Sequence, residues 1–152
     1  PVLGIEPAAN VAEVARAKGI MTEVHFLGAE TGSALAARYG RADLVVGNNV
    51  YAHVPDLVDF TAGLAALVKP SGLVTLEFPH LQRLIERNQY DTIYHEHYQY
   101  LTLLTAQRAL ATADLIVVNE AVRNWVAPQF TVVERGAIGL DNFGSSCLVP
   151  KT

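Results

Sequence analysis

Short apolar runs alternate with segments of helical periodicity along most of this chain. The apolar runs are bounded by glycine, proline or polar residues and predict buried strands at 2–5, 22–27, 43–47, 73–78 and 115–118. Between them, apolar residues recur every three or four positions, which predicts helices at 10–18, 29–39, 55–68, 81–87 and 105–112. Further on, 129–134 has the pattern of a strand and 136–144 that of a loop.

The alternation of strands and helices predicts the fold class. Each strand is too apolar to expose one face to water, so we expect an α/β fold with a Rossmann-like parallel sheet and helices on both faces. Ligands in such folds bind beyond the carboxyl ends of the strands. The polar residues that fall at those ends are Glu6, Asn48, Asn49, His53 and Glu77.

Composition narrows the class of protein. With 152 residues, 51% apolar and 17% charged, the chain is long and apolar enough for a folded domain. A net charge of −4 without a basic run argues against binding to nucleic acid or to an anionic membrane. No apolar run reaches the roughly 20 residues of a membrane span, and no segment resembles a signal peptide. The single cysteine, Cys147, excludes a disulfide framework, and we expect a cytoplasmic protein.

Two strand ends carry candidate binding groups. Glu6 follows the first strand, where an acid can accept both ribose hydroxyls of an adenosine ligand, whether a dinucleotide or S-adenosylmethionine. A solvated acid at a strand end is the alternative. Asn48 and Asn49 can bind a ligand or satisfy backbone groups of a turn, and His53 beyond them can donate or accept a proton near neutral pH.

The segment 89–98, QYDTIYHEHY, concentrates two histidines, two acids and three tyrosines. A histidine such as His97 suits removal of an acidic C–H proton at neutral pH. Glu96 can orient it, and the Tyr94 hydroxyl can stabilise an enolate. Two alternatives stay open on residue types alone, since His95 and His97 can form half of a metal site or a hydrogen-bonded structural loop.

Four segments, in order, resemble one known family. They are VLGIEPAANVA (2–12), NNVYAHVPD (48–56), EFPHL (77–81) and YDTIYHEHY (90–98). Together they resemble the S-adenosylmethionine-dependent sugar C-methyltransferases, which include enzymes that methylate C3 of nucleotide-linked 4-keto deoxysugars in antibiotic biosynthesis. The resemblance covers residues 1–114, and the sequence no longer follows the family pattern beyond Asp114. It implies a class I methyltransferase domain at 1–114 and a divergent tail at 115–152, which can begin a carboxyl-terminal region.

The resemblance also implies a reaction and its catalytic residues. A ketone at C4 acidifies the C3 proton, a base removes it, and the enolate attacks the methyl group of S-adenosylmethionine. His97 matches the base, and Tyr94 and Glu96 match residues that bind the sugar or its enolate. Asn49 and His53 match an active-site Asn-x-x-x-His segment. The implied partner is a nucleotide sugar.

The cofactor site implied by the resemblance consists of Glu6, Pro7, Asn48 and Asn49, with Glu6 on the adenosyl ribose. Family members carry a cysteine-based zinc segment and then a glycine-rich first strand and loop. We expect both to precede this chain, so we expect no metal site within it and weak binding of S-adenosylmethionine to the isolated chain. The alternatives are the NAD-binding domain of a sugar oxidoreductase and an inactive truncated remnant with an open sheet edge.

Overall fold

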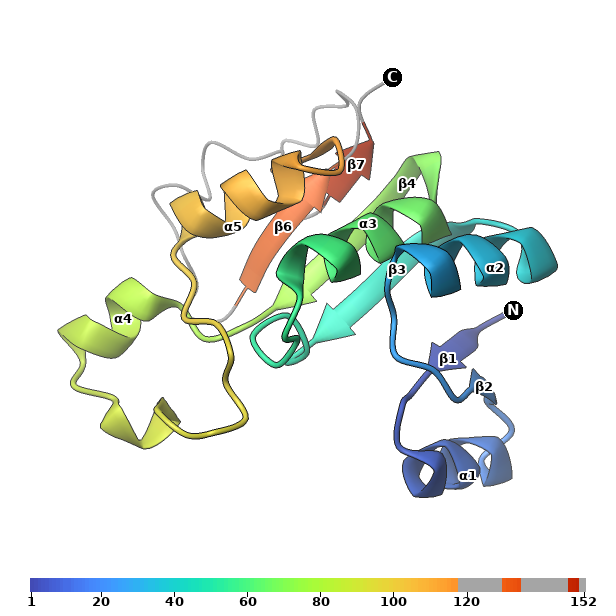
Figure 1. Cartoon of the computed structure of the whole chain (residues 1–152), viewed down its shortest axis with the longest axis horizontal. Coiled ribbons are helices and arrows are strands. Elements are labelled where there is room, and N and C mark those ends of the chain that lie inside the picture. The colour runs from blue at the N-terminus through green and yellow to red at the C-terminus, as the bar shows by residue number, and fades with distance from the viewer. Residues whose placement is uncertain (118–129, 135–147, 151–152) are drawn as a thin grey trace.

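The computed structural model describes residues 1–117, 130–134 and 148–150 of the chain (Figure 1). All of the predicted helices are present, each within two residues of its expected bounds. They are α1 (Ala9–Ala17), α2 (Ala29–Tyr39), α3 (Leu57–Leu67), α4 (Leu81–Glu86) and α5 (Leu103–Ala111). One short 3₁₀-helix, η1 (Tyr90–Thr92), lies in the histidine-rich segment.

The strands form two sheets. They are β1 (Leu3–Ile5), β2 (Met21–Glu23), β3 (Ala42–Asn48), β4 (Val68–Glu77), β5 (Leu115–Val117), β6 (Phe130–Glu134) and β7 (Leu148–Pro150). β1 and β2 pair in parallel as a separate two-stranded sheet, and the others follow the order β3-β4-β6-β5-β7 with an added β4–β7 pairing. β3 and β4 are parallel, whereas β6 runs antiparallel to β4 and β5. The α/β class is confirmed, but the sheet is mixed rather than wholly parallel. The loop expected at 136–144 lies outside the described residues.

β2 is shorter than the predicted strand at 22–27 because its partner ends early. The ladder runs only from Leu3↔Met21 to Ile5↔Glu23. Beyond it, the Glu6 N–H still donates to the Glu23 carbonyl at 3.0 Å, but the next N–H on that side of the strand, that of Ala8, donates to the Glu6 carboxylate instead. The length of β2 is therefore set by the point at which β1 ends, which the local pattern at 22–27 does not reveal.

The helical cover of the large sheet is one-sided at β3. α3 and α5 lie along one side of the sheet, with α2 against α3 (Figure 1). α3 buries the predicted apolar face through Phe60, Leu64 and Leu67. On the other side of β3, Leu44 and Val46 are 52% and 57% exposed. The expectation of helices on both faces therefore fails at this strand in the described part of the chain.

α2 and α3 cross at two glycines. A Cβ atom on Gly63 would lie 2.6 Å from the Gly28 carbonyl oxygen, and one on Gly32 would lie 2.6 Å from the Gly63 carbonyl oxygen. Both distances are below van der Waals contact, and both neighbours are backbone atoms that cannot rotate away. The crossing thus requires residues without a side chain at these two positions.

We expect Gly63→Ala to lower the free energy of unfolding by about 2 kcal/mol. Alanine gains about 1 kcal/mol of helix propensity over glycine, but overpacking costs about 1–3 kcal/mol, here toward the upper end because backbone must shift. Urea unfolding measures the change. Ser33→Ala, at an exposed position of α2, is the control and should stay within about 0.5 kcal/mol of the original. A more stable Gly63→Ala protein would contradict the close crossing.

Candidate active site

The carboxyl ends of β3 and β4 meet as the sequence predicts. Asn48 pairs with Glu77 across the parallel ladder, and the Asn49 N–H donates to the Glu77 carbonyl at 2.9 Å. Asn49 has φ 51°, in the left-handed region that asparagine tolerates better than most residues. Both asparagine side chains are exposed and form no hydrogen bond with the described residues, so their amides are available to a ligand.

The loop between β3 and α3 holds the histidine-rich segment. Tyr51 and Ala52 of this loop are buried. The Ala52 carbonyl accepts from the Tyr98 N–H at 2.9 Å and from the Gln99 N–H at 3.1 Å. The His53 Nδ1 lies 3.0 Å from the Glu96 carbonyl oxygen. These three bonds bring segments that are far apart in the sequence into contact at one site.

His97 lies at the centre of a cluster of aromatic rings. Its ring centroid is 4.3 Å from that of Tyr94, 4.6 Å from that of His53 and 5.9 Å from that of Tyr100. His97 is half-buried, whereas Tyr94 is 42% exposed. The structure therefore brings together three of the predicted catalytic residues, His53, Tyr94 and His97, with one side of the cluster open to solvent.

Hydrogen bonds to backbone carbonyls define the tautomers of both histidines. The His97 Nδ1 lies 2.7 Å from the Thr92 carbonyl oxygen, and the His53 Nδ1 is bonded to Glu96 in the same way. A carbonyl oxygen only accepts, so each Nδ1 carries the hydrogen. In the neutral ring the lone pair then lies on Nε2, which can accept a proton from a substrate.

Glu96 does not orient His97 through its carboxylate. The Glu96 side chain is 62% exposed, and its Oε1 lies 4.0 Å from the Nε2 of His95, whose side chain is 91% exposed. The backbone carbonyl of Thr92 orients His97 instead. In the described part of the chain, no three His, Cys, Asp or Glu side chains are grouped to hold a metal; Cys147 lies outside it.

Glu6 is held at the end of β1, apart from the histidine cluster. It is half-buried, and its Oε1 accepts from the Ala8 N–H at 2.8 Å, which leaves the second carboxylate oxygen available to a ligand hydroxyl. Pro7 beside it is exposed. β1 points the same way as β3 in Figure 1. Within the described residues, however, no hydrogen bond or ring contact joins Glu6 to Asn48, Asn49 or the rings.

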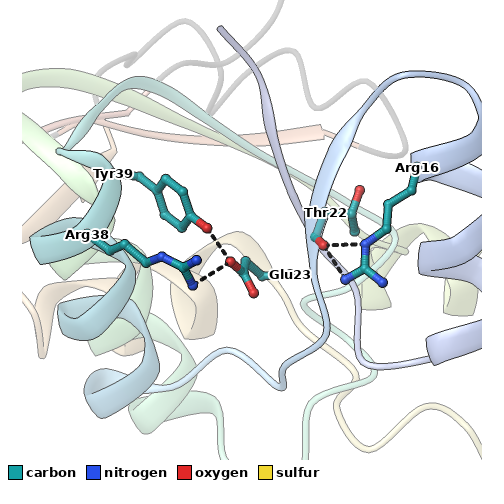
Figure 2. Close-up of polar contacts among 5 residues, drawn as sticks. All are labelled: Arg16, Thr22, Glu23, Arg38 and Tyr39. Carbon is teal, nitrogen blue, oxygen red and sulfur yellow. Dashed lines mark hydrogen bonds and ion pairs between the residues drawn. The ribbon is translucent and has the colours of Figure 1, made fainter.

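A second carboxylate, Glu23, attaches the small sheet to α2 (Figure 2). Glu23 accepts from the Arg38 Nη1 at 2.9 Å and from the Tyr39 hydroxyl. The Tyr39 hydrogen bond lowers the pKa of Glu23, as does the charge of Arg38, and the same bond raises the pKa of Tyr39. β1, α1 and β2 otherwise contact mainly one another.

Glu23 also contacts Glu6, the residue predicted to bind the cofactor ribose. Glu23 contributes its carbonyl to the Glu6 N–H, so the same residue joins Glu6 to α2. On the other side of β2, the Arg16 guanidinium donates twice to the Thr22 carbonyl, at 2.9 and 2.5 Å. Glu23 was not among the predicted site residues, although a carboxylate inside the apolar run at 22–27 is a signal that it needs a partner.

The fold is that of S-adenosylmethionine-dependent methyltransferases. A S-adenosylmethionine-dependent methyltransferase from Thermotoga maritima matches with a TM-score of 0.55 at 13% identity, over 99% of this chain and 73% of that one. Another from Mesorhizobium loti matches with a TM-score of 0.55 at 15% identity, over 87% of this chain and 78% of that one. At such identities the likeness establishes the fold alone, and it confirms the predicted class I type.

The chain belongs to the methyltransferase-domain family, whose sequence model matches residues 1–120. It is also 43% identical over 102 residues to C-methyltransferase NovU of Streptomyces niveus, across 67% of this chain and 24% of the relative. The chain thus spans about a quarter of the length of that curated relative. Family membership favours the methyltransferase prediction over an NAD-binding domain. Among the described helices, none has the length and apolar character needed to cross a bilayer.

Proposed function

We propose that the protein transfers a methyl group from S-adenosylmethionine to a sugar carbon next to a ketone. The substrate would be a nucleotide-linked 4-keto deoxysugar and the carbon its C3. The observation that carries the proposal is the His97 ring, whose Nδ1 is bonded to the Thr92 carbonyl and whose Nε2 is left to act as a base. The similarity to a protein named as a C-methyltransferase supports methylation at carbon.

In this proposal His97 performs the proton transfer. Its Nε2 takes the C3 proton, and the C–H electron pair moves into an enolate with its charge on the C4 oxygen. The Tyr94 hydroxyl, on the ring that contacts His97, donates a hydrogen bond to that oxygen. Asn49 and His53 bind the sugar, and Glu96 contributes to sugar binding from the exposed side. The imidazolium then releases its proton to solvent.

The residues at the strand ends fit the cofactor. The unbonded oxygen of Glu6 suits a ribose hydroxyl, and Pro7, Asn48 and Asn49 present exposed groups at strand ends. When bound, S-adenosylmethionine would supply the electrophilic methyl group, which would pass to the enolate carbon as its bond to sulfur breaks. The single Cys147 agrees with a cytoplasmic location.

The test is an assay with S-adenosylmethionine labelled as CD₃ and a nucleotide-linked 4-keto deoxysugar. NMR of the product should show a CD₃ group on C3. In D₂O without the methyl donor, the C3 hydrogen should exchange with solvent, because proton removal precedes methylation. A methyl group on oxygen or nitrogen, or hydride transfer from a nicotinamide cofactor without methylation, would overturn the proposal.

A further inference from the structure

His80 is a buried histidine that the proposed chemistry does not use. It is 5% exposed and lies just beyond the end of β4. Its Nε2 accepts a hydrogen bond from the Leu103 N–H at 3.0 Å, and its Nδ1 is buried and has no hydrogen-bond partner among the described residues. The EFPHL segment that contains it was part of the family resemblance, yet no role was assigned to this residue.

His80 lies where the two ends of segment 81–100, which carries Tyr94 and His97, come together. The chain leaves the sheet after His80, whose carbonyl accepts from the Leu84 N–H in α4. It returns at Leu101, which pairs with His80 in a parallel bridge and accepts from the Leu81 N–H at 2.9 Å. Between these points, residues 81–100 include Tyr94 and His97. The His80 ring thus lies where this segment leaves and rejoins the rest of the fold.

The His80 ring provides a hydrogen-bond acceptor for a backbone N–H at the start of α5, that of Leu103. The first N–H groups of a helix have no partner within the helix. A capping box in α5 satisfies two backbone groups, since the Thr105 N–H donates to the Thr102 hydroxyl and the Thr102 N–H to the Thr105 hydroxyl. The Leu103 N–H between them is satisfied by the His80 ring.

The accepting Nε2 defines the state of the His80 ring. It must hold a lone pair, so Nδ1 carries the hydrogen and the ring is neutral. Burial lowers the pKa of His80, the charge of Arg83 acts in the same direction, and Glu86 opposes them. A buried N–H without a partner is unfavourable, so a purely apolar residue would suit packing better. The hydrogen bond that Nε2 accepts from Leu103 explains why a histidine occupies this position.

We propose that His80 is a positioning residue for His97, because its ring fixes the return of the segment 81–102 onto α5. The inference rests on the proposed role of His97 as the base. The segment has a second attachment at the Ala52 carbonyl, which accepts from Tyr98 and Gln99. Both attachments follow His97 in the chain, one at Tyr98 and Gln99 and the other at Leu103, and together they define where Tyr94 and His97 lie. Without the His80 ring, the return is held at this point only by the backbone bond from the Leu81 N–H to the Leu101 carbonyl, so Leu103 and the start of α5 can shift.

The test compares His80→Gln, His80→Leu and His80→Asn. The glutamine Oε1 can reach the Leu103 N–H, leucine fills the space without an acceptor, and asparagine is polar but too short. Two NMR readouts apply to the chain itself: hydrogen exchange of the Leu103 amide and the ring signals of His97 and Tyr94. We expect at least tenfold faster exchange and shifted ring signals in His80→Leu and His80→Asn, and near-original values in His80→Gln.

Several outcomes would overturn the inference. If the His97 and Tyr94 signals are unchanged in His80→Leu while exchange at Leu103 is faster, His80 only caps α5 and does not position His97. Equal exchange rates and ring signals in His80→Gln and His80→Asn would show that the hydrogen-bond acceptor at this position does not hold the segment. This comparison tests the inference even if His80→Leu does not fold. A long-range ¹⁵N spectrum of the original chain showing hydrogen on Nε2 would also overturn it. Absence of methyl transfer would refute the proposed function but leave these readouts unchanged.

Discussion

Replacing His97 with alanine is expected to lower the rate of methyl transfer by about 10²–10⁴-fold, the usual contribution of a general base. The affinity for S-adenosylmethionine should change little, because no described contact joins His97 to Glu6 or Pro7. Single-turnover kinetics measures the first quantity and calorimetry the second, both on the active protein that carries this chain. A loss confined to kcat is the signature of an interaction made in the transition state.

His95→Ala is the matched control for this experiment. His95 lies two residues away, and its side chain is 91% exposed. It contacts the ring of Tyr94 edge-on at 6.4 Å, but no ring contact joins it to His97. Its removal should leave the rate within a few-fold of the original. An unchanged rate in His97→Ala would exclude His97 as the base. His53 would then be the alternative base, since it has the same tautomer and its Nε2 forms no hydrogen bond with the described residues.

The sequence was most informative where local rules determine the outcome. Helix positions followed from apolar spacing and were confirmed within two residues, because amphipathic periodicity is a property of the segment itself. The meeting of Asn48 and Glu77 was also predictable, since parallel strands place their carboxyl ends at one edge of a sheet. Composition singled out 89–98, and the structure places Tyr94 and His97 of that segment in ring contact.

The missed features depend on contacts between distant segments. A carboxylate next to a histidine suggested that Glu96 orients His97, but the Thr92 carbonyl does so. Every residue has a carbonyl, so no residue type marks the one that will be used. The division into two sheets depends on strand pairing, which the alternation pattern leaves open. Gly32 and Gly63 were visible as glycines inside helical patterns, a known sign of close packing, yet the sequence does not say which helix approaches.

Tyr51, in the loop between β3 and α3, occupies the centre of the core. It is fully buried, and its ring packs against Phe60 at 6.0 Å and Phe78 at 5.7 Å between centroids. The Thr61 hydroxyl donates to the Leu57 carbonyl at 2.6 Å, so the Tyr51 hydroxyl donates to Thr61 at 2.8 Å. Burial raises the pKa of Tyr51 to about 12. The phenol is therefore neutral at all ordinary pH values.

We expect Tyr51→Ala to lower the free energy of unfolding by about 3–5 kcal/mol, the cost of emptying a buried aromatic site. Tyr51→Phe keeps the ring and loses one hydrogen bond, so it should cost only about 1 kcal/mol. Urea unfolding of both variants separates the packing contribution from the polar one. Equal losses in the two variants would show that the hydroxyl, and not the ring, stabilises this core. Domains of this size have about 5–15 kcal/mol of stability in total. Tyr51→Ala should therefore leave a marginal fold, and the Ala52 carbonyl, which holds the histidine segment, directly follows the altered residue.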